Sequence, residues 1–199
     1  MATAQGHLLE ALFFLALTTS MRKGEILDLM WADVEWEKSV IRVGRPYQPV
    51  SYEGGTLVPT KTRSGRRAIM VGPVALALLK EHREKPELQK ALVGDRWKEH
   101  GMIFTTSIGT CLDQTEVSRA FKQIMRVANL ADIRFHDLGH TSISILLDNG
   151  TPLNTVQSRA GHSKASVTTA IYGHAMARSR QQAARMIEEI VTLLINELQ

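Results

Sequence analysis

A single β-rich segment interrupts a chain whose apolar residues otherwise repeat at helical spacing, and this contrast limits the possible folds. Residues 39–43, 56–60 and 68–71 are rich in apolar and β-branched side chains and are separated by Gly, Pro and Ser, which predicts three short strands. Strands that follow one another without intervening helices form antiparallel sheets rather than βαβ units. The sequence therefore predicts a mainly α fold with one small three-stranded antiparallel sheet.

Helical periodicity is found on both sides of this segment. Before it, residues 5–18 and 21–31 are predicted to be helical, and the Thr-Thr-Ser run at 18–20 offers N-cap chemistry for the second helix. Residues 86–99 are a weaker, charged helix or a linker. Further helices are predicted at 73–85, 114–129, 136–148, 152–159, 163–173 and 176–198.

Length, charge and cysteine content exclude several classes of protein. A chain of 199 residues fits one domain, and 24 Lys and Arg against 20 Asp and Glu favour a polyanionic partner. The only cysteine, Cys111, excludes an intrachain disulfide and a Cys-based zinc site, and fits a reducing cytoplasm. Residues 8–17 form the longest apolar stretch, which is too short to cross a bilayer and lacks the features of a signal peptide.

Two motifs contain basic side chains that could bind a ligand or take part in a reaction. Arg22 and Glu25 lie three residues apart at the start of a predicted helix, where a guanidinium could bind a phosphate and the carboxylate could orient it. An ordinary surface ion pair also explains that spacing, and on spacing alone it is the favoured interpretation. The second motif is a basic turn between two strands, which is either a probe for a nucleic-acid groove or a solvated turn; its basic residues are Lys61, Arg63, Arg66 and Arg67.

Histidine and tyrosine residues form two further motifs. His136 and His140 are four residues apart, so they share a helix face and could hold a metal, but a structural pair is favoured because no third ligand follows at a usual interval. His162 precedes Tyr172 by ten residues. A tyrosine hydroxyl, with a pKa of about 10, needs cationic neighbours or a base before it can act as a nucleophile. Taken alone, Tyr172 is better explained as a residue that packs its ring into the core.

The order and spacing of these motifs resemble the catalytic domain of tyrosine recombinases, the phage integrase family. The resemblance spans residues 18–174 and is carried by TTSMRKGEILDLMWADV, PTKTRSGRRAIMV, FHDLGHTSISILLDNGT and AGHSKASVTTAIYGH. It implies the tyrosine recombinase catalytic-domain fold and an enzyme that cuts and rejoins double-stranded DNA. It also implies that no metal, nucleotide cofactor or small-molecule substrate takes part.

The resemblance also implies a role for each matching residue. Tyr172 is the implied nucleophile, which forms a 3′-phosphotyrosyl link and releases a 5′-hydroxyl. Arg63, Arg66 and Arg67 are expected to contact DNA. The groups implied to bind the phosphate and move protons are Arg22, supported by Glu25, together with Lys61, His136 and His162.

One position departs from the family pattern. The family has His-x-x-Arg where this chain has His136 followed by Gly139, so one of two phosphate-binding arginines is absent. Loss of one such donor costs roughly 10²- to 10³-fold in rate. Arg134 is a conceivable substitute. We therefore hypothesise DNA binding with weak or absent strand exchange, and a non-catalytic DNA-binding module is the first alternative. A metal-dependent hydrolase built on His136, His140 and His162 is the second, which the basic turn argues against.

The expected domain organisation follows from the same resemblance. Residues 1–199 are expected to be a single catalytic domain without the helical core-binding domain that family members carry, so DNA affinity should be modest and dependent on salt. Residues 176–198 form an apolar helix that either packs on its own domain or docks in trans onto a second copy, and we expect self-association on DNA. The expected location is the cytoplasm, with the nucleoid when the protein is bound to DNA.

Overall fold

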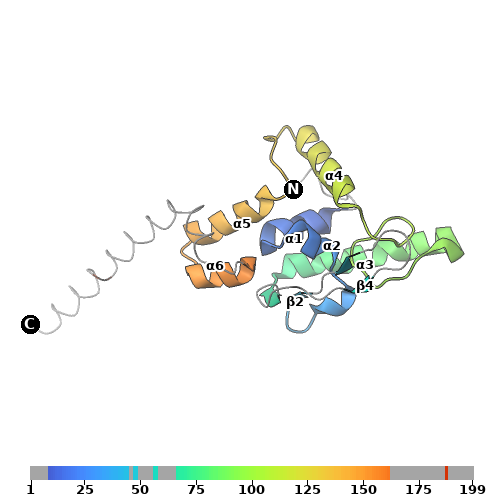
Figure 1. The fold of residues 1–199 in the computed structure, drawn as a ribbon, viewed down its shortest axis with the longest axis horizontal. Helices are drawn as coiled ribbons and strands as arrows, with labels where there is room; N and C mark the ends of the chain where they lie inside the picture. Colours follow the sequence, from blue (N-terminus) through green and yellow to red (C-terminus); the bar gives the residue numbers. More distant parts are fainter. Residues whose placement is uncertain (1–8, 45–46, 49–55, 58–65, 162–186, 188–199) are drawn as a thin grey trace, which may run out of the picture.

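The computed structural model describes residues 9–44, 47–48, 56–57, 66–161 and 187, and helices dominate this part of the chain (Figure 1). Two helices precede the sheet, α1 (Glu10–Thr19) and α2 (Lys23–Leu27), and the 3-10 turn η2 (Trp31–Asp33) follows them. After the sheet come α3 (Pro73–Val93), η4 (Gly94–Arg96), α4 (Gln114–Val127), α5 (Asp137–Asp148) and α6 (Leu153–Ala160). The mainly helical architecture is as predicted.

The early helices differ from the prediction in their boundaries. Ser20 has a left-handed conformation and ends α1, while the Thr19 hydroxyl donates back to the carbonyl of Leu15, so the Thr-Thr-Ser run does not cap the next helix. α2 ends at Leu27 because the backbone then pairs with a distant segment, as the Ile103 amide donates to the Leu29 carbonyl. Later, α3 continues without a break to Val93 through residues expected to be a weaker helix or a linker.

The sheet has three antiparallel strands in the order β1 (Val34–Glu35), β2 (Val40–Val43) and β5 (Arg67–Met70). Ile41 is the central residue, paired with Val34 on one side and Ile69 on the other. The predicted three-stranded antiparallel sheet is confirmed, but one of its strands is wrong. Residues 56–57 form β4 (Thr56–Leu57), which pairs with β3 (Tyr47–Gln48) in a separate small sheet. β1 was missed because a two-residue strand is too short to show an alternating pattern.

Two groups of buried apolar residues hold the described helices together. The larger is the main core, which lies between α1, α2, α3, α4 and the three-stranded sheet and contains a cluster of the rings of Phe13, Phe121 and Phe135, with centroids 5.5–6.0 Å apart. The smaller lies between α5 and α6 and consists of Ile143, Leu147, Val156 and Ala160. Within the described ranges, no helix combines the length and apolar character needed to cross a membrane.

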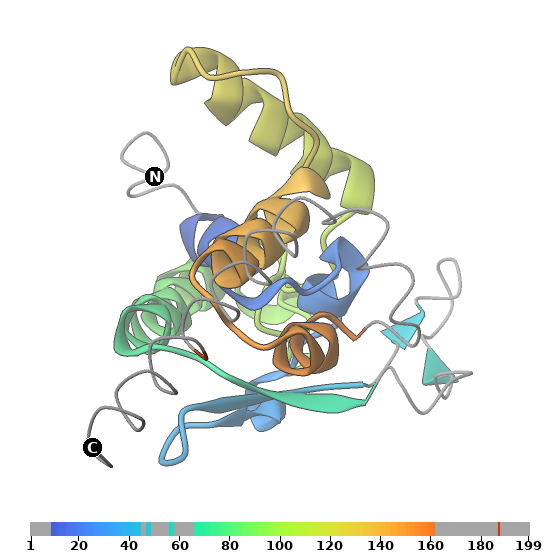
Figure 2. The ribbon, with the colours of Figure 1, turned by 90° about the vertical axis from the view of Figure 1, so that its left-hand side faces the viewer.

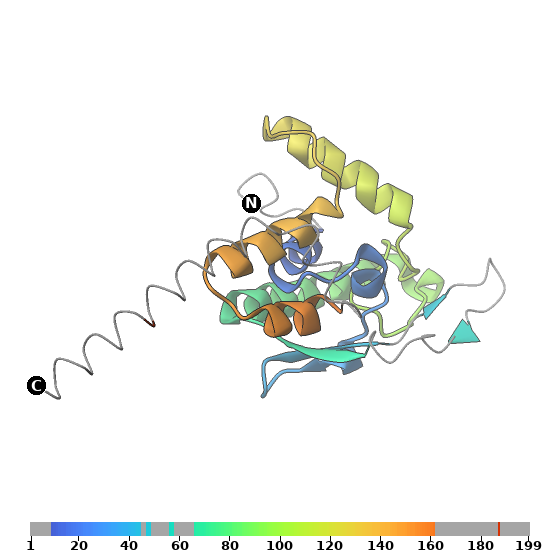
Figure 3. The same ribbon diagram turned by 60° about the vertical axis from the view of Figure 1, so that its left-hand side comes forward.

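The arrangement of the helices places α6 at the centre of one side. Figure 2 shows α6 between α5 and the three-stranded sheet, and α6 contacts both α5 and β5. α5 packs against α1, so the start of α5 lies beside the turn that joins α1 to α2. α4 projects from this body on the opposite side from the sheet (Figure 3). The end of α1, the start of α5 and the end of α6 are thereby brought near the start of α2.

Candidate active site

Arg22 and Glu25 are in contact at the start of α2, as the sequence predicts. Arg22 is the N-cap residue, and its backbone amide donates to Oε2 of Glu25 at 2.8 Å. Its guanidinium Nη1 donates to Oε1 of the same carboxylate at 3.1 Å. The Arg22 side chain is 51% exposed, so its guanidinium is held in place while solvent still reaches it. A half-exposed and oriented guanidinium can bind a phosphate.

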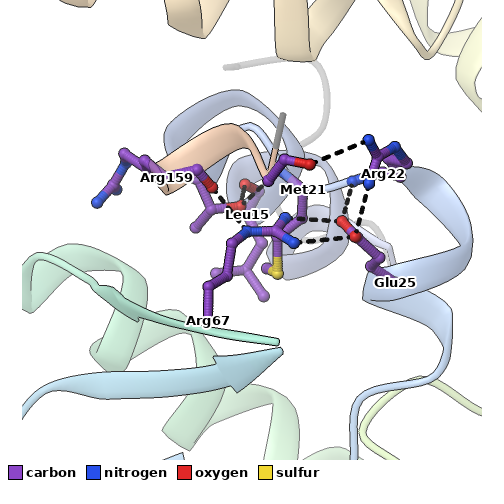
Figure 4. Close-up of polar contacts among 8 residues, drawn as sticks. Leu15, Met21, Arg22, Glu25, Arg67 and Arg159 are labelled. Carbon is purple, nitrogen blue, oxygen red and sulfur yellow. Dashed lines mark hydrogen bonds and ion pairs between the residues drawn. The ribbon is translucent and has the colours of Figure 1, made fainter. Parts of the chain in front are cut away.

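Arg67 binds the same carboxylate from the other side (Figure 4). Its Nη1 and Nη2 donate to Oε1 and Oε2 of Glu25 at 3.0 and 2.8 Å, a bidentate pair, and the Arg67 side chain is only 5% exposed. Burial alone would raise the pKa of Glu25, but hydrogen bonds and positive charge from Arg67 and Arg22 outweigh it and lower that pKa. Glu25 is therefore a carboxylate shared by two arginines.

Both arginines also reach the end of α6. Arg67 Nε donates to the carbonyl of Arg159 at 2.8 Å, and Arg22 Nη2 donates to the carbonyl of Gly161 at 3.4 Å. Gly161 ends α6 with φ of 67°, and a Cβ atom at this position would lie 2.6 Å from Nη1 of Arg67. The last carbonyls of a helix lack partners within the helix and carry partial negative charge, so guanidinium donors stabilise them.

A third arginine ties α6 to the rest of the body. The Arg159 side chain donates from Nη1 to the carbonyl of Met70 at 2.9 Å and from Nη2 to that of Thr18 at 2.8 Å. These bonds join α6 to β5 and to the end of α1, and burial lowers the pKa of Arg159. The sequence around Arg159 carries no local signal of such a role. We call the following four residues the arginine junction: Arg22, Glu25, Arg67 and Arg159.

Gly139 lies on the face of α5 that meets the turn before Arg22. A Cβ atom at this position would be 3.9 Å from the carbonyl oxygen of Ser20, an ordinary contact, and its backbone is outside the left-handed region. One turn further along the helix, the Ser142 hydroxyl bonds that of Ser20 at 2.8 Å. Neither space nor backbone conformation requires glycine here. A side chain at this position would begin beside the residues that lead into Arg22.

The two histidines at the start of α5 are in edge-to-face contact, and His136 is exposed. The rings of His136 and His140 have centroids 4.7 Å apart and are nearly perpendicular, at 87°. Burial, followed by the charge of neighbouring groups, lowers the pKa of His140. In the part of the chain that the structure describes, no three His, Cys, Asp or Glu residues are placed to hold a metal ion. His162, the third member of the alternative metal site, lies outside the described residues.

Arg134, the conceivable substitute for the absent arginine, is committed to another partner. Its Nη2 donates to Oδ1 of Asp137 at 3.0 Å, and its backbone amide donates to Oδ2 of the same carboxylate. The hydrogen bonds and charge of Arg134 lower the pKa of Asp137. In this arrangement the Arg134 side chain is held by Asp137, the first residue of α5.

Of the other predicted site residues, Arg66 and Arg67 lie in the described part of the chain, and the remainder lie outside it. Arg66 is exposed, as expected of a basic turn, whereas the side chain of Arg67, also predicted to contact DNA, is buried against Glu25. The predicted helix at 176–198 lies outside the described residues except for Ile187, and the predicted helix at 163–173 lies entirely outside them. The predicted site residues outside the described ranges are Lys61, Arg63, His162 and Tyr172.

Comparison with known proteins gives matches over nearly the whole chain. The model of the phage integrase family matches residues 2–178. A tyrosine recombinase XerC-like protein of Caldanaerobacter subterraneus subsp. tengcongensis is 32% identical over 198 residues, covering 94% of this chain and 50% of that protein. An integrase of Streptomyces ambofaciens is 33% identical over 178 residues, covering 85% and 45%. The chain thus spans about half the length of these relatives.

Solved structures show the same fold. The Tn1549 transposon integrase in complex with transposon right end DNA has a TM-score of 0.75 and 19% identity, over 90% of this chain and 59% of that one. The XerA recombinase has a TM-score of 0.70 and 18% identity, over 92% and 60%. The expected tyrosine recombinase catalytic-domain fold is therefore confirmed.

Proposed function

The chain belongs to the phage integrase family of tyrosine recombinases, and from this membership we propose that it is the catalytic domain of a site-specific DNA recombinase. The observation that carries the proposal is the state of Arg22. Contacts with Glu25 and Gly161 use two of its five N–H groups, and half of its side chain faces solvent. A guanidinium that is oriented before the substrate arrives stabilises charge on a reacting phosphate.

The reaction we propose conserves the energy of the cleaved bond. The phenolic oxygen of Tyr172 attacks phosphorus and passes its proton to one of the two histidines, the bond from phosphorus to the 5′-oxygen breaks, and Lys61 donates a proton to that oxygen. His136 and His162 bind phosphate oxygens and assist the proton transfers. Rejoining is the reverse, in which a 5′-hydroxyl attacks the 3′-phosphotyrosine, so no nucleotide is consumed. Positioning and positive charge supply the catalysis, as phosphoryl transfer requires.

Gly139 makes this an impaired enzyme in our proposal. The family's second phosphate-binding arginine would start from this position. It lies beside the carbonyl of Ser20, which precedes Arg22 by two residues. With glycine there, we expect normal DNA binding and a cleavage rate lowered by roughly 10²- to 10³-fold. The alternative function, a DNA-binding module without catalysis, is supported by the same glycine.

The expected partner is double-stranded DNA, and residues 1–199 act as one catalytic domain. Phosphate contacts supply most of the affinity of such a protein, so binding should weaken steeply as salt rises. We further propose that residues 176–198 dock onto a neighbouring copy when the protein is bound to DNA, and that the protein works in the cytoplasm, on the nucleoid.

Covalent capture on DNA tests this function directly. A pool of nicked duplexes with randomised sequence allows the cleaved fragment to leave, so that a protein–DNA adduct accumulates and can be recovered after denaturation. We expect an adduct with the chain and none with Tyr172→Phe, although both bind DNA equally. Salt-dependent DNA binding without any adduct, even after extended incubation and with arginine at position 139, would instead establish the non-catalytic module.

A further inference from the structure

Arg67, the first residue of β5, joins two segments that carry or lead to proposed catalytic residues. One is the start of α2 with Arg22, and the other is the end of α6, which His162 follows in the sequence. We propose that Arg67 is a positioning residue that couples these segments and holds Arg22 in register with the end of α6 through Glu25. The catalytic consequence of this coupling rests on the proposed function, whereas the coupling itself does not.

The hydrogen bonds of Arg67 support this role. Its three nitrogens each donate to a different acceptor atom, two on Glu25 in α2 and one on the carbonyl of Arg159 in α6. The side chain starts from the first residue of β5 and is almost completely buried. Only a planar guanidinium has donors directed to all three positions at once, so lysine can replace the charge but not the geometry.

The charge balance explains how Arg67 affects Arg22. One carboxylate between two guanidinium groups leaves a net charge of +1 on the three residues, and the buried arginine makes the bidentate contact. Glu25 is therefore kept ionised and correctly oriented. It can hold Arg22 while the two arginines and the carboxylate together keep one positive charge. Without Arg67, burial would favour the protonated form of the Glu25 carboxyl, which accepts weaker hydrogen bonds and no longer holds the guanidinium of Arg22 in place.

The apolar clusters do not provide this coupling. The buried side chains of α6, Val156 and Ala160, pack in the small cluster with α5, whereas α2 contributes Ile26 and Leu27 to the main core. Within the part of the chain that the structure describes, polar contacts through Arg22 and Arg67 join α2 to the end of α6. A shift of the α6 end is thus transmitted to Glu25 and to the guanidinium of Arg22.

Two simpler explanations compete with this proposal, and comparison with the Arg66→Met variant distinguishes them from it. If Arg67 contacts DNA like its exposed neighbour, Arg67→Met and Arg66→Met will lower DNA affinity alike, each reducing the slope of log affinity against log salt by about 1. If Arg67 only stabilises the fold, its removal will lower the unfolding free energy without a specific effect on the segments it joins. Arg66→Met is therefore the matched control, since it removes the same charge one position away.

Amide hydrogen exchange measures the coupling without any DNA. In Arg67→Met we expect exchange to accelerate about tenfold or more both at residues 22–27 and at residues 157–161, and to stay unchanged there in Arg66→Met. Arg67→Lys should protect residues 22–27 better than residues 157–161, because an ammonium can hold Glu25 but not also the α6 carbonyl. If Arg67→Met fails to fold, Arg67→Lys provides the test of the coupling. For Arg67→Met, acceleration in only one segment, or equal acceleration with Arg66→Met, would refute the coupling. For Arg67→Lys, protection of residues 157–161 as strong as that of residues 22–27 would refute it.

The pH dependence of cleavage provides a readout that a purely structural role would not change. Glu25 is faced by Arg22 and Arg67, and removing Arg67 leaves burial as the dominant influence, so the pKa of Glu25 rises. We expect adduct formation by Arg67→Met to fall at least about tenfold and to recover as pH increases and Glu25 ionises. The double variant Arg67→Met/Glu25→Gln should lose that recovery, and a recovery that persists there contradicts the proposal. If no variant forms an adduct, the proposed function fails, and hydrogen exchange still decides the coupling.

Discussion

The main core and the arginine junction hold together by different forces. In the main core, apolar side chains from four helices and the sheet are removed from water, and the stabilisation depends on buried area rather than on direction. In the arginine junction, guanidinium groups donate to carboxylate and carbonyl oxygens at defined angles. The proposed chemistry is located at the junction because phosphate recognition needs groups with fixed directions. The core supplies stability, and the junction supplies orientation.

The largest expected effect on the unfolding free energy comes from truncating a side chain in the main core, and the same truncation in the small cluster between α5 and α6 should cost less. Leu12→Ala, at a fully buried position of α1, should lower the unfolding free energy by about 4 kcal/mol. Leu147→Ala makes the same change in the small cluster, where the residue is 8% exposed, and should cost about 2 kcal/mol because neighbouring groups can relax. Urea unfolding of both variants checks this ranking, and an equal or greater loss for Leu147→Ala contradicts it.

An intermediate effect is expected where α6 meets the junction. Gly161→Ala should cost about 2 kcal/mol, because alanine is strained at a φ of 67° and its Cβ would displace Arg67 from Glu25. Gly150→Ala is the matched control, since its φ is 78° but nothing lies within 4 Å of the added atom, so only the backbone strain of about 1 kcal/mol remains. Urea unfolding gives both values. Equal losses would show that Arg67 moves aside without cost.

The smallest expected effect is a pH dependence of stability that comes from Glu25. Its pKa is lowered in the folded protein, so its stabilisation is fully present above the ordinary value of 4.5 and is lost as pH falls through the folded-state pKa. The melting temperature of the chain should therefore exceed that of Glu25→Gln at pH 7, and the difference should shrink below pH 4.5. A difference that is constant from pH 7 to pH 3 would mean that Arg67 does not stabilise the charged carboxylate.

The predictability of the fold depended on how local each signal was. α4 was predicted within two residues because its apolar residues occupy one face over four turns, and α5 and α6 were predicted within one residue. The two residues of β1 were missed, because their partners in β2 determine their conformation and so short a strand has no pattern of its own. The end of α2 was misplaced because a distant backbone segment competes for its hydrogen bonds.

The site shows the same dependence on locality. The contact between Arg22 and Glu25 was predictable because residues three apart on a helix are neighbours. The partner of Arg67 is 42 residues away, so no spacing indicated it. Alternation along β5 was a usable signal, since Arg67 lies on the same face as the buried Ile69 whereas Arg66 and Ala68 face the other way. The distant partners of Arg159 were likewise invisible in the sequence.

Restoring the absent guanidinium is the sharpest test of the proposal that strand cleavage is assembled at this junction and lacks one phosphate-binding arginine. The measurement is the rate of covalent adduct formation on nicked duplex DNA by the chain, by Gly139→Arg and by Gly139→Ala, a control for the backbone change. We predict a rise of roughly 10²- to 10³-fold for Gly139→Arg and little change for Gly139→Ala. Equally fast adduct formation by all three proteins would contradict it.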